Sequence, residues 1–382
     1  MQRLAPATPE QVLDAVRGAL ADGVPLEVLG AGTKRGFGRP MQTAAALDLS
    51  GLSGIVAYEP EELVVTCRAG TRQADLEAAL AERRQCLAFE PADWGPMFGA
   101  APGAGTIGGV VAANLAGPRR ISHGAARDHV LGLACVSGLG EAFVCGGRVV
   151  KNVTGFDLPK LLTGSLGTLA VISEITLRVA PLPETTATVV LRDLDDRAAV
   201  AAMTAALSSP HEVSGAAHVG TVTALRIEGP PVSVAARAGA LSATLGSTET
   251  WDGERSRTFW TAVRDVTPFA AGTGPLWRLF LPPAAAAAAV SAIRAAVAAE
   301  VLYDRGGAQV WLATASPAAD IIRAAAQAAG GQATLVRAPT DVRAAIPPFH
   351  PEPPALARLS ERLKQAFDPR RILNPGRRSP AL

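Results

Sequence analysis

The sequence predicts a mixed fold of α-helices and β-strands that is divided into two or three domains. The chain has 382 residues, and a typical domain has about 150. Strand-like apolar runs alternate with helix-like segments along its first half, a pattern typical of mixed α/β domains. Glycine-rich stretches at 30–38 and 95–117 interrupt this alternation. Such a high density of glycine usually marks places where the backbone comes close to another group.

The N-terminal segment carries the signals of a helix followed by a strand. Thr8 is a suitable N-cap, Pro9 fits the first turn, and Gly23 can end the helix. A short strand is expected over 26–29. Within the helix, hydrophobic residues recur at helical spacing, namely Val12, Leu13, Val16 and Leu20.

A second strand and helix are expected after the first glycine-rich loop. Residues 63–67 form a β-type run, and Thr71 is placed to cap a helix that carries Leu76, Ala79 and Leu80. From 129 onward the pattern returns to strands. We expect them at 129–138, 141–147 and 168–179, with a helix and its approaches between the second and third at 147–167.

Pro181 and Pro183 mark the predicted domain boundary. Residues 184–345 have the pattern of a second α/β unit, and a helix over 354–367 precedes the end of the chain. The apolar segment 282–302 is not expected to cross a membrane, because alanine is only weakly apolar and Arg294 lies within it. A soluble helix packed on a sheet is the better interpretation.

Composition excludes several classes of function. The 36 basic and 34 acidic residues nearly balance, whereas nucleic-acid binding usually requires a basic surplus. The four cysteines contain no C-x-x-C pair, so we expect no iron–sulfur cluster in this chain. The N-terminal sequence MQRLAPATPE lacks the basic flank and apolar run of a signal peptide. A cytoplasmic location is therefore expected.

Two glycine loops suggest phosphate binding. GAGTKRG, at 30–36, does not match the dinucleotide fingerprint G-x-G-x-x-G, because Gly36 comes one place late and no helix follows directly. Such a loop alone would be an ordinary turn. A second loop, GTIGG at 105–109, precedes a run of small apolar residues. Consecutive backbone N–H groups with little side-chain bulk can surround a pyrophosphate, and two such loops favour that interpretation.

The same motifs resemble a known family. GAGTK at 30–34, the glycine-rich segment 102–118, ARDHVLGL at 126–133 and the segment 147–179 occur in the order and spacing of the flavin domain of FAD-linked oxidases. These flavoproteins are the vanillyl-alcohol oxidase and p-cresol methylhydroxylase type. The ending FDPRRILNPGR, at 367–377, is similar as well. The likeness is strong over 1–182 and 365–377 and weak over 183–345.

The resemblance implies an α+β fold with three parts. Residues 1–182 would form a two-subdomain FAD-binding PCMH-type domain, and 183–345 a smaller α/β cap domain. Residues 346–382 would form a C-terminal helix and tail that return to the flavin domain.

Within the family, the modest length and GGAQVWL at 306–312 are similar to the short FAD-binding subunits of bacterial glycolate oxidases. Such a complex oxidises glycolate and similar 2-hydroxy acids to 2-oxo acids. The resemblance implies a larger FAD-binding subunit as partner, which would hold the substrate, and an iron–sulfur subunit. It also implies a cytoplasmic location, with attachment to the inner membrane through those partners. This chain would then be an electron-transferring or structural subunit.

The resemblance also implies roles for particular residues. Those against the pyrophosphate would be Gly30, Ala31, Gly32, Thr33 and Lys34. Those on the other side of the flavin cleft would be Pro91, Gly105, Thr106, Ile107, Gly108, Gly109, Asn114 and Gly117. Those near adenine and ribose would be Gly167, Thr168 and Ile172. Taken alone, Ile172 would be an ordinary strand residue and Lys34 a solvated charge.

Histidines set this chain apart from much of the family. Some members bond flavin covalently through a histidine in the first loop, but 30–38 has none, so non-covalent FAD is expected. Related 2-hydroxyacid dehydrogenases carry H-x-G-D-G-N-x-H in the cap domain, which binds substrate and metal. The histidines here are scattered and form no such motif, being His123, His129, His211, His218 and His350. We therefore assign no catalytic residue and no metal ligand.

Two alternatives remain open from the sequence. The chain could be a stand-alone FAD-dependent 2-hydroxyacid dehydrogenase, with an anion clamp among the cap arginines Arg226, Arg237, Arg278 and Arg305. It could also be a scaffold subunit that has lost its flavin, although the intact loops at 30–34 and 105–109 argue against this.

Overall fold

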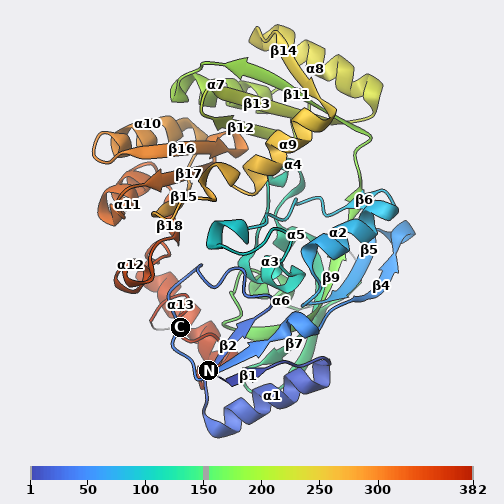
Figure 1. Cartoon of the computed structure of the whole chain (residues 1–382), viewed down its shortest axis with the longest axis vertical. Helices are drawn as coiled ribbons and strands as arrows, with labels where there is room; N and C mark the ends of the chain where they lie inside the picture. Colours follow the sequence, from blue (N-terminus) through green and yellow to red (C-terminus); the bar gives the residue numbers. More distant parts are fainter. Residues whose placement is uncertain (1, 149–154, 381–382) are drawn as a thin grey trace. The chain divides into compact units, whose positions relative to one another are not determined.

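The computed structural model describes residues 2–148 and 155–380. The chain divides into two compact units, and the first is made of three separate stretches of sequence. The first unit consists of Met1–Ala116, Gly124–Leu182 and Pro351–Leu382. The second consists of Gly117–His123 and Pro183–His350 (Figure 1).

The first unit has two main sheets. A parallel sheet has the order β1-β3-β2 and contains β1 (Gln2–Leu4), β2 (Leu26–Leu29) and β3 (Ala45–Asp48). An antiparallel sheet has the order β4-β5-β9-β7-β8 and contains β4 (Ile55–Glu59), β5 (Val64–Arg68), β7 (Val130–Ser137), β8 (Ala142–Gly146) and β9 (Ala170–Arg178). Two short strands, β6 (Gln85–Cys86) and β10 (Ala180–Pro181), form a separate antiparallel pair.

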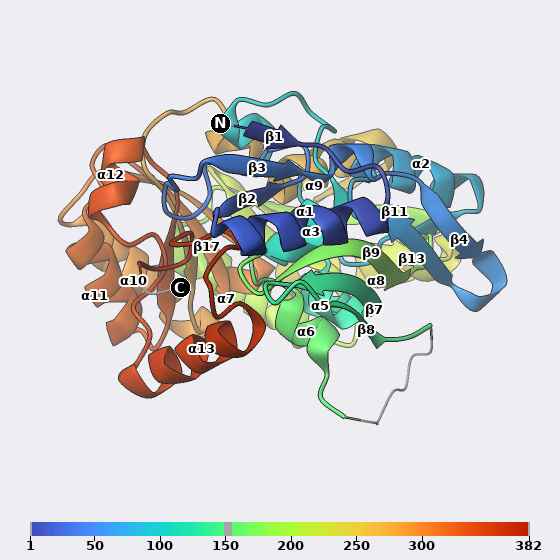
Figure 2. The ribbon, with the colours of Figure 1, turned by 90° about the horizontal axis from the view of Figure 1, so that it is seen from below.

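The helices of the first unit surround these sheets. They are α1 (Pro9–Asp22), α2 (Gln73–Glu82), α3 (Ile107–Ala113), α5 (Ala126–His129), α6 (Leu158–Leu162) and α13 (Pro354–Phe367). Helix α1 contacts β7 and β9, and it lies in the foreground of Figure 2, which shows the chain from below. Its buried side chains share one apolar core with both sheets and with the C-terminal tail, through Val12, Val16, Leu26, Leu47, Val136, Val171 and Leu373.

Local sequence signals predicted several of these elements correctly. Thr8 caps α1 by accepting a hydrogen bond from the N–H of Gln11, and Gly23 ends it in a left-handed conformation. The strand at 26–29 and the three strands between 129 and 179 are confirmed. In the segment predicted to contain a helix, α6 is present, while residues 149–154 lie outside the described part of the chain.

The strand expected at 63–67 is confirmed with its ends shifted by one residue, and one local prediction was wrong. The strand begins at Val64, because Leu63 has a left-handed φ of 57° that a strand cannot include. Thr71 does not cap α2, whose N-cap residue is Arg72. The Thr71 hydroxyl is instead within hydrogen-bond distance of the carbonyl oxygens of Arg68 and Gly54, so it closes the turn after β5.

The second unit is built on one antiparallel sheet of eight strands, in the order β14-β11-β13-β12-β16-β17-β15-β18. Its strands are β11 (Thr185–Arg192), β12 (Gly215–Val219), β13 (Val222–Gly229), β14 (Glu249–Asp252), β15 (Leu276–Phe280), β16 (Ala299–Asp304), β17 (Gln309–Thr314) and β18 (Gln332–Arg337). Its helices are α4 (Arg120–His123), α7 (Asp196–Leu207), α8 (Pro231–Leu245), α9 (Gly253–Arg264), α10 (Pro283–Arg294), α11 (Ala319–Ala328) and α12 (Thr340–Ala345).

The two faces of this sheet differ. One face is covered by α7, α8, α10 and α11, which bury alternate strand residues such as Leu279, Val310 and Leu312 in a continuous apolar core. On the other face, the Trp260 indole of α9 donates a hydrogen bond of 2.8 Å to the Thr188 hydroxyl of β11.

Residues 117–123 belong to the second unit, although the sequence analysis placed them in the first. The guanidinium of Arg119 forms an ion pair with Glu228 of β13 at 2.6 Å. Ile121 packs against the apolar core of this unit. The residues that make these contacts are far apart in the sequence, so the local sequence pattern does not predict the contacts.

A buried ion pair stabilises the packing of the C-terminal segment in the first unit. The Lys364 ammonium of α13 donates to the Asp368 carboxylate at 2.7 Å, and both side chains are buried. The same ammonium also donates to the carbonyl oxygens of Thr168 and Leu373. The Asp368 carboxylate accepts two backbone N–H groups, from Ile372 and Leu373. Both charges are therefore hydrogen-bonded, as burial requires.

Within the described residues, no helix is long and apolar enough to cross a membrane. The apolar segment near residue 282 forms the twelve-residue helix α10, which packs on the sheet.

We predict that Asp368→Asn destabilises the first unit by about 3–5 kcal/mol, because it leaves the buried Lys364 ammonium without its counter-charge. Urea unfolding measures this. Glu361→Gln is the matched control, since Glu361 pairs with Arg371 in the same segment but both side chains are partly exposed, and pairs near the surface contribute about 1 kcal/mol or less. Equal effects of the two substitutions would contradict the role given to the buried pair.

Candidate functional site: a cleft in the first unit

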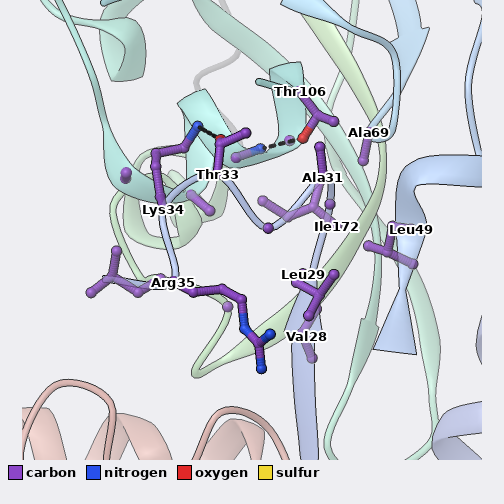
Figure 3. Close-up of a pocket in the computed structure, with 18 of the residues that line it drawn as sticks. Val28, Leu29, Ala31, Thr33, Lys34, Arg35, Leu49, Ala69, Thr106 and Ile172 are labelled. Atoms are coloured by element: carbon purple, nitrogen blue, oxygen red, sulfur yellow. Dashed lines mark hydrogen bonds between the residues drawn. The ribbon is translucent and has the colours of Figure 1, made fainter. Parts of the chain in front are cut away.

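A cleft in the first unit brings both glycine loops together (Figure 3). Its empty volume is about 760 Å³, including the part open to solvent. Its walls come from β2 and the loop after it, from α3, and from the segment that leads into β9.

The first loop presents backbone donors to this cleft. Residues 30–34 follow β2, and Gly32 takes a left-handed φ of 71°, which glycine adopts without strain. For the backbone N–H groups of 31–34, no hydrogen-bond partner is found among the described residues. Consecutive N–H groups of this kind attract an anion.

Lys34 supplies the positive charge at this end of the cleft. Its ammonium donates to the Thr33 hydroxyl at 3.2 Å (Figure 3). Burial lowers the pKa of Lys34 to about 8, and the nearby Arg377 contributes, while Asp93 opposes the shift. A cation held below its usual pKa by burial would be stabilised by an anion beside it.

The backbone N–H groups of the second loop, 105–109, differ from those of the first loop in their hydrogen bonding. Thr106 caps α3 by accepting the N–H of Gly109 at 3.2 Å. The N–H groups of Ile107 and Gly108 donate to the carbonyl oxygens of Thr71 and Ala69. Three N–H groups of this loop are thus already satisfied within the protein.

Glycines in the two loops are required by close packing. A Cβ on Gly30 would lie 2.3 Å from the Thr106 hydroxyl oxygen, and one on Gly109 would lie 3.2 Å from the Lys34 ammonium. Gly108 faces away from these groups, since its Cβ would lie 2.7 Å from the Ala69 carbonyl oxygen. Gly108 therefore lets α3 approach the turn after β5, and its small size does not serve a phosphate directly.

The remainder of the cleft wall is mainly apolar. It is formed by Val28, Leu29, Leu49, Ala69, Ala112, Ala113, Leu166, Ala170 and Ile172. A wall of small and branched aliphatic side chains suits the face of a flat aromatic ring system. The cleft thus joins an anion-binding end to an apolar surface, which is the combination that a dinucleotide with aromatic bases requires.

The structure places the predicted site residues in two groups. Those that line the cleft are Gly30, Ala31, Gly32, Thr33, Lys34, Thr106, Gly108, Gly109, Gly167 and Ile172. Those that do not line it are Pro91, Gly105, Ile107, Asn114, Gly117 and Thr168.

Members of the second group hold neighbouring parts in place. The Pro91 carbonyl accepts a hydrogen bond from Gln73, and Ile107 is buried in α3. Asn114 ends α3 with a left-handed φ of 49°. The Thr168 carbonyl accepts a hydrogen bond from the Lys364 ammonium. Gly105 lies beside the cleft, where a Cβ would be 3.5 Å from the Lys34 ammonium. Gly117 belongs to the second unit, where its carbonyl accepts from Arg305.

Sequence reasoning missed Arg377. Its guanidinium donates to the carbonyl oxygen of Lys34 at 2.8 Å and lines the cleft. The only signal was its position at the end of the ILNPGR motif. The aliphatic wall residues, such as Leu49, gave no signal that distinguished them from core residues.

The histidines His129, His218 and His350 lie in different parts of the structure. His129 is buried and tilted against Phe89 at a ring separation of 5.3 Å. His218 is within hydrogen-bond distance of the Thr223 hydroxyl, and burial lowers the pKa of His218. His350 accepts the N–H of Ala333, and burial, followed by Arg323, lowers its pKa too. In the described part of the chain, no three His, Cys, Asp or Glu side chains are grouped to hold a metal.

Comparisons with known proteins agree with this geometry. The family model described as FAD binding domain matches residues 2–146. The glycolate oxidase subunit GlcE of Escherichia coli K12 is 35% identical over 369 residues, 96% of each chain. The glycolate oxidase subunit GlcD of Bacillus subtilis 168 is 32% identical over 163 residues, 42% of this chain and 33% of GlcD.

A solved structure of alkyldihydroxyacetonephosphate synthase is similar in fold, with a TM-score of 0.69 at 14% identity over 98% of this chain and 76% of that one. The fold is therefore the mixed α/β fold of FAD-binding oxidases. By its full-length similarity, this chain belongs to the FAD-binding protein family of the glycolate oxidase subunit GlcE.

Proposed function

We propose that the chain is the FAD-binding GlcE-type subunit of a glycolate oxidase complex, in which it serves electron transfer or assembly rather than the oxidation of substrate. The observation that carries this is the full-length similarity to GlcE, together with a cleft that suits FAD. The complex would oxidise glycolate and similar 2-hydroxy acids to 2-oxo acids.

The cleft residues can hold FAD in a definite way. The backbone N–H groups of 31–34 and the Lys34 ammonium would bind the pyrophosphate, and Thr33 and Gly109 would position that ammonium. Gly167 and Ile172 would lie against adenine and ribose. The walls come from two sheets, with β2 in the parallel sheet and β9 in the antiparallel one. Bound flavin supplies the redox chemistry, accepting and passing on electrons.

Non-covalent binding is supported by the lining of the cleft. A covalent flavin bond requires a nucleophilic side chain, and the described residues that line the cleft include no histidine, cysteine or tyrosine. The flavin should therefore dissociate when the chain unfolds.

The lack of a catalytic base supports a role without turnover. The H-x-G-D-G-N-x-H motif of related dehydrogenases is missing from the sequence. General-base catalysis is typically worth about 10²–10⁴-fold. A chain that lacks this group would oxidise glycolate slowly at best, so we place the substrate in a larger, GlcD-like FAD-binding subunit. An iron–sulfur subunit would carry the electrons onward, in the cytoplasm or at the inner membrane through these partners.

We predict that the flavin-loaded chain alone will not reduce a dye with glycolate at a useful rate, whereas the complex will, and will need this chain. Acid precipitation should release all the FAD into the supernatant. The measurements are flavin absorbance and glycolate-dependent dye reduction, with and without the partner subunits. Rapid reduction by the lone chain would support an independent dehydrogenase. A colourless chain would support the scaffold alternative, and flavin that stays on the precipitate would refute the non-covalent mode.

Gly109 and Gly108 should separate flavin binding from packing. We predict that Gly109→Val lowers FAD content with little change in melting temperature, because a Cβ there meets the flexible end of Lys34 most closely and lies at ordinary contact distance from the Thr106 hydroxyl. Gly108→Val should lower both, because its side chain meets the Ala69 backbone. Flavin content per chain and thermal melting test this. Full flavin content in Gly109→Val would remove the Lys34 ammonium from the proposed site.

The affinity for FAD should fall as the pH rises above about 8. The pKa of Lys34 is about 8 in the free chain, and a bound pyrophosphate would raise it. Binding then takes up a proton, so the Lys34 contribution is complete below pH 8 and is lost as the pH rises through the pKa of the complex. Titration of the flavin-free chain with FAD from pH 7 to 10 measures this. Lys34→Met should bind weakly and show a flat profile over that range; a profile unchanged from the parent chain would exclude Lys34.

A further inference from the structure

Helix α13 of the first unit leaves its apolar side chains exposed. Leu356, Leu359 and Leu363 recur on it at helical spacing, so they form one stripe along the helix. Leu356 and Leu359 are 54% and 50% exposed, and Leu363 is partly buried. Within α13, which the structure describes throughout, only Lys364 is fully buried. A helix of 14 residues is marginally stable without packing of an apolar face, and this leucine stripe is largely unused inside the first unit.

A groove lies beside the leucine stripe, between α13 and α6. Its empty volume is about 1090 Å³, including the part open to solvent. Leu363 of α13, Leu161 of α6 and Leu169 give it apolar walls, and Figure 2 shows the two helices from below. None of the residues that line this groove lines the flavin cleft. The groove is therefore a separate feature of the first unit.

One wall of the groove carries a buried hydroxyl group without a partner. Ser165 lines the groove and is only 5% exposed, and for its Oγ there is no hydrogen-bond partner among the described residues. The neighbouring hydroxyls of Thr163 and Thr168 are used, since they donate to the carbonyl oxygens of Pro159 and Ser165. A buried hydroxyl without a partner is costly, and this one can donate to an acceptor that enters the groove.

The side chains around the groove and the leucine stripe carry a positive surplus. Ion pairs that are already complete there are Lys160 with Asp157 and Arg378 with Glu352. Three exposed arginines have no carboxylate partner in the described part of the chain: Arg127, which lines the groove, and Arg358 and Arg362, which follow one side of the stripe. A polypeptide with carboxylates beside its apolar side chains complements such a surface.

We propose that the leucine stripe and the groove together form the docking site for an acidic, amphipathic helix of a partner subunit in the glycolate oxidase complex. Contiguous exposed apolar residues with a polar rim mark interaction surfaces, and a helix presents its apolar face to such a row. A carboxylate of this helix enters the groove, where it pairs with Arg127 and accepts a hydrogen bond from the Ser165 hydroxyl. Further carboxylates pair with Arg358 and Arg362 along the other side of the stripe.

The groove favours a protein segment over a lipid surface. A basic amphipathic helix such as α13 also suits an anionic membrane. A bilayer surface, however, would cover the leucine stripe and leave the concave groove and the Ser165 hydroxyl unfilled, whereas a helix with projecting side chains reaches both. The choice of a partner subunit as the occupant rests on the proposed function, while the surface itself follows from the first unit alone.

The test is the affinity of the flavin-loaded, full-length chain for the purified larger FAD-binding subunit and for the purified iron–sulfur subunit, measured by biolayer interferometry. The parent chain should bind one of them, and more weakly as the salt concentration rises, because charge pairs contribute. Leu359→Asp should weaken this binding by about tenfold or more, the scale of a lost residue at the centre of an interface. Arg127→Glu should weaken it and reduce its salt dependence.

Ser165→Ala separates docking from folding. It removes a hydroxyl that has no partner in the free chain, so the variant should be no less stable than the parent chain. It should nevertheless bind the partner subunit more weakly, because the hydrogen bond to the entering carboxylate is lost. A lower melting temperature with unchanged affinity would show that the hydroxyl serves the fold and would remove it from the docking site.

Val232→Asp and Arg257→Glu are the matched controls. Val232 is 85% exposed on α8, and Arg257 is exposed on α9, both in the second unit. These controls introduce the same changes of charge as Leu359→Asp and Arg127→Glu, and they should leave the affinity unchanged. Melting temperature and flavin content show that each variant is folded. Equal losses in a variant and its control would overturn the proposal.

Other occupants of the surface would give different results. Cosedimentation with vesicles of anionic phospholipid that Leu359→Asp abolishes, at unchanged affinity for the subunits, would show a lipid surface. A dimer of the parent chain that Leu359→Asp converts to a monomer, again at unchanged affinity, would show a second copy of this chain. Either result would overturn the proposal.

Failure of this proposal is distinguishable from failure of the proposed function. If the parent chain binds FAD and assembles into an active complex, but Leu359→Asp and Arg127→Glu assemble equally well, the docking site is refuted and the proposed function stands. If the parent chain binds neither purified subunit, the proposed function fails, and the docking site fails with it.

Discussion

The buried contacts of the C-terminal segment fix both walls of the flavin cleft. The side chain of Asn374 accepts the N–H of Val28 in β2 and donates to the carbonyl oxygen of Leu166. Lys364 holds the carbonyl oxygen of Thr168 two residues further on. One wall leads into the loop at 30–34 and the other into β9, so the separation of the walls depends on residues that come near the end of the chain. Burial of Lys364 and Asp368 is tolerable because every charged atom of the pair has hydrogen-bond partners.

The two glycine loops contribute differently to the cleft because they are packed differently. Helix α3 begins against the turn at 69–71, and that turn takes the N–H groups of Ile107 and Gly108. The loop at 31–34 lines the cleft, and its N–H groups have no hydrogen-bond partner among the described residues. The second loop contributes through its shape, because the absence of a side chain at Gly109 leaves room for the Lys34 ammonium.

Elements with complete local signals could be predicted from the sequence. Helix α1 has a cap, a first-turn proline and a terminal glycine, and its ends were predicted correctly. Thr71 shows the limit of such signals, because its hydroxyl serves the preceding turn. The cleft loops were found from glycine density and family resemblance. Arg377 was not, since its position depends on a tail that returns over more than three hundred residues.

The chemistry of the cleft agrees with the proposed division of labour between subunits. The loop at 31–34 has backbone donors and a cation suited to a pyrophosphate. Oxidation of a 2-hydroxy acid must remove a hydroxyl proton as well as a hydride equivalent. The described residues that line the cleft include no histidine, aspartate or glutamate, and His218 and His350, which lie elsewhere, have hydrogen-bond partners of their own. The proposed role in electron transfer or assembly requires no such base in this chain.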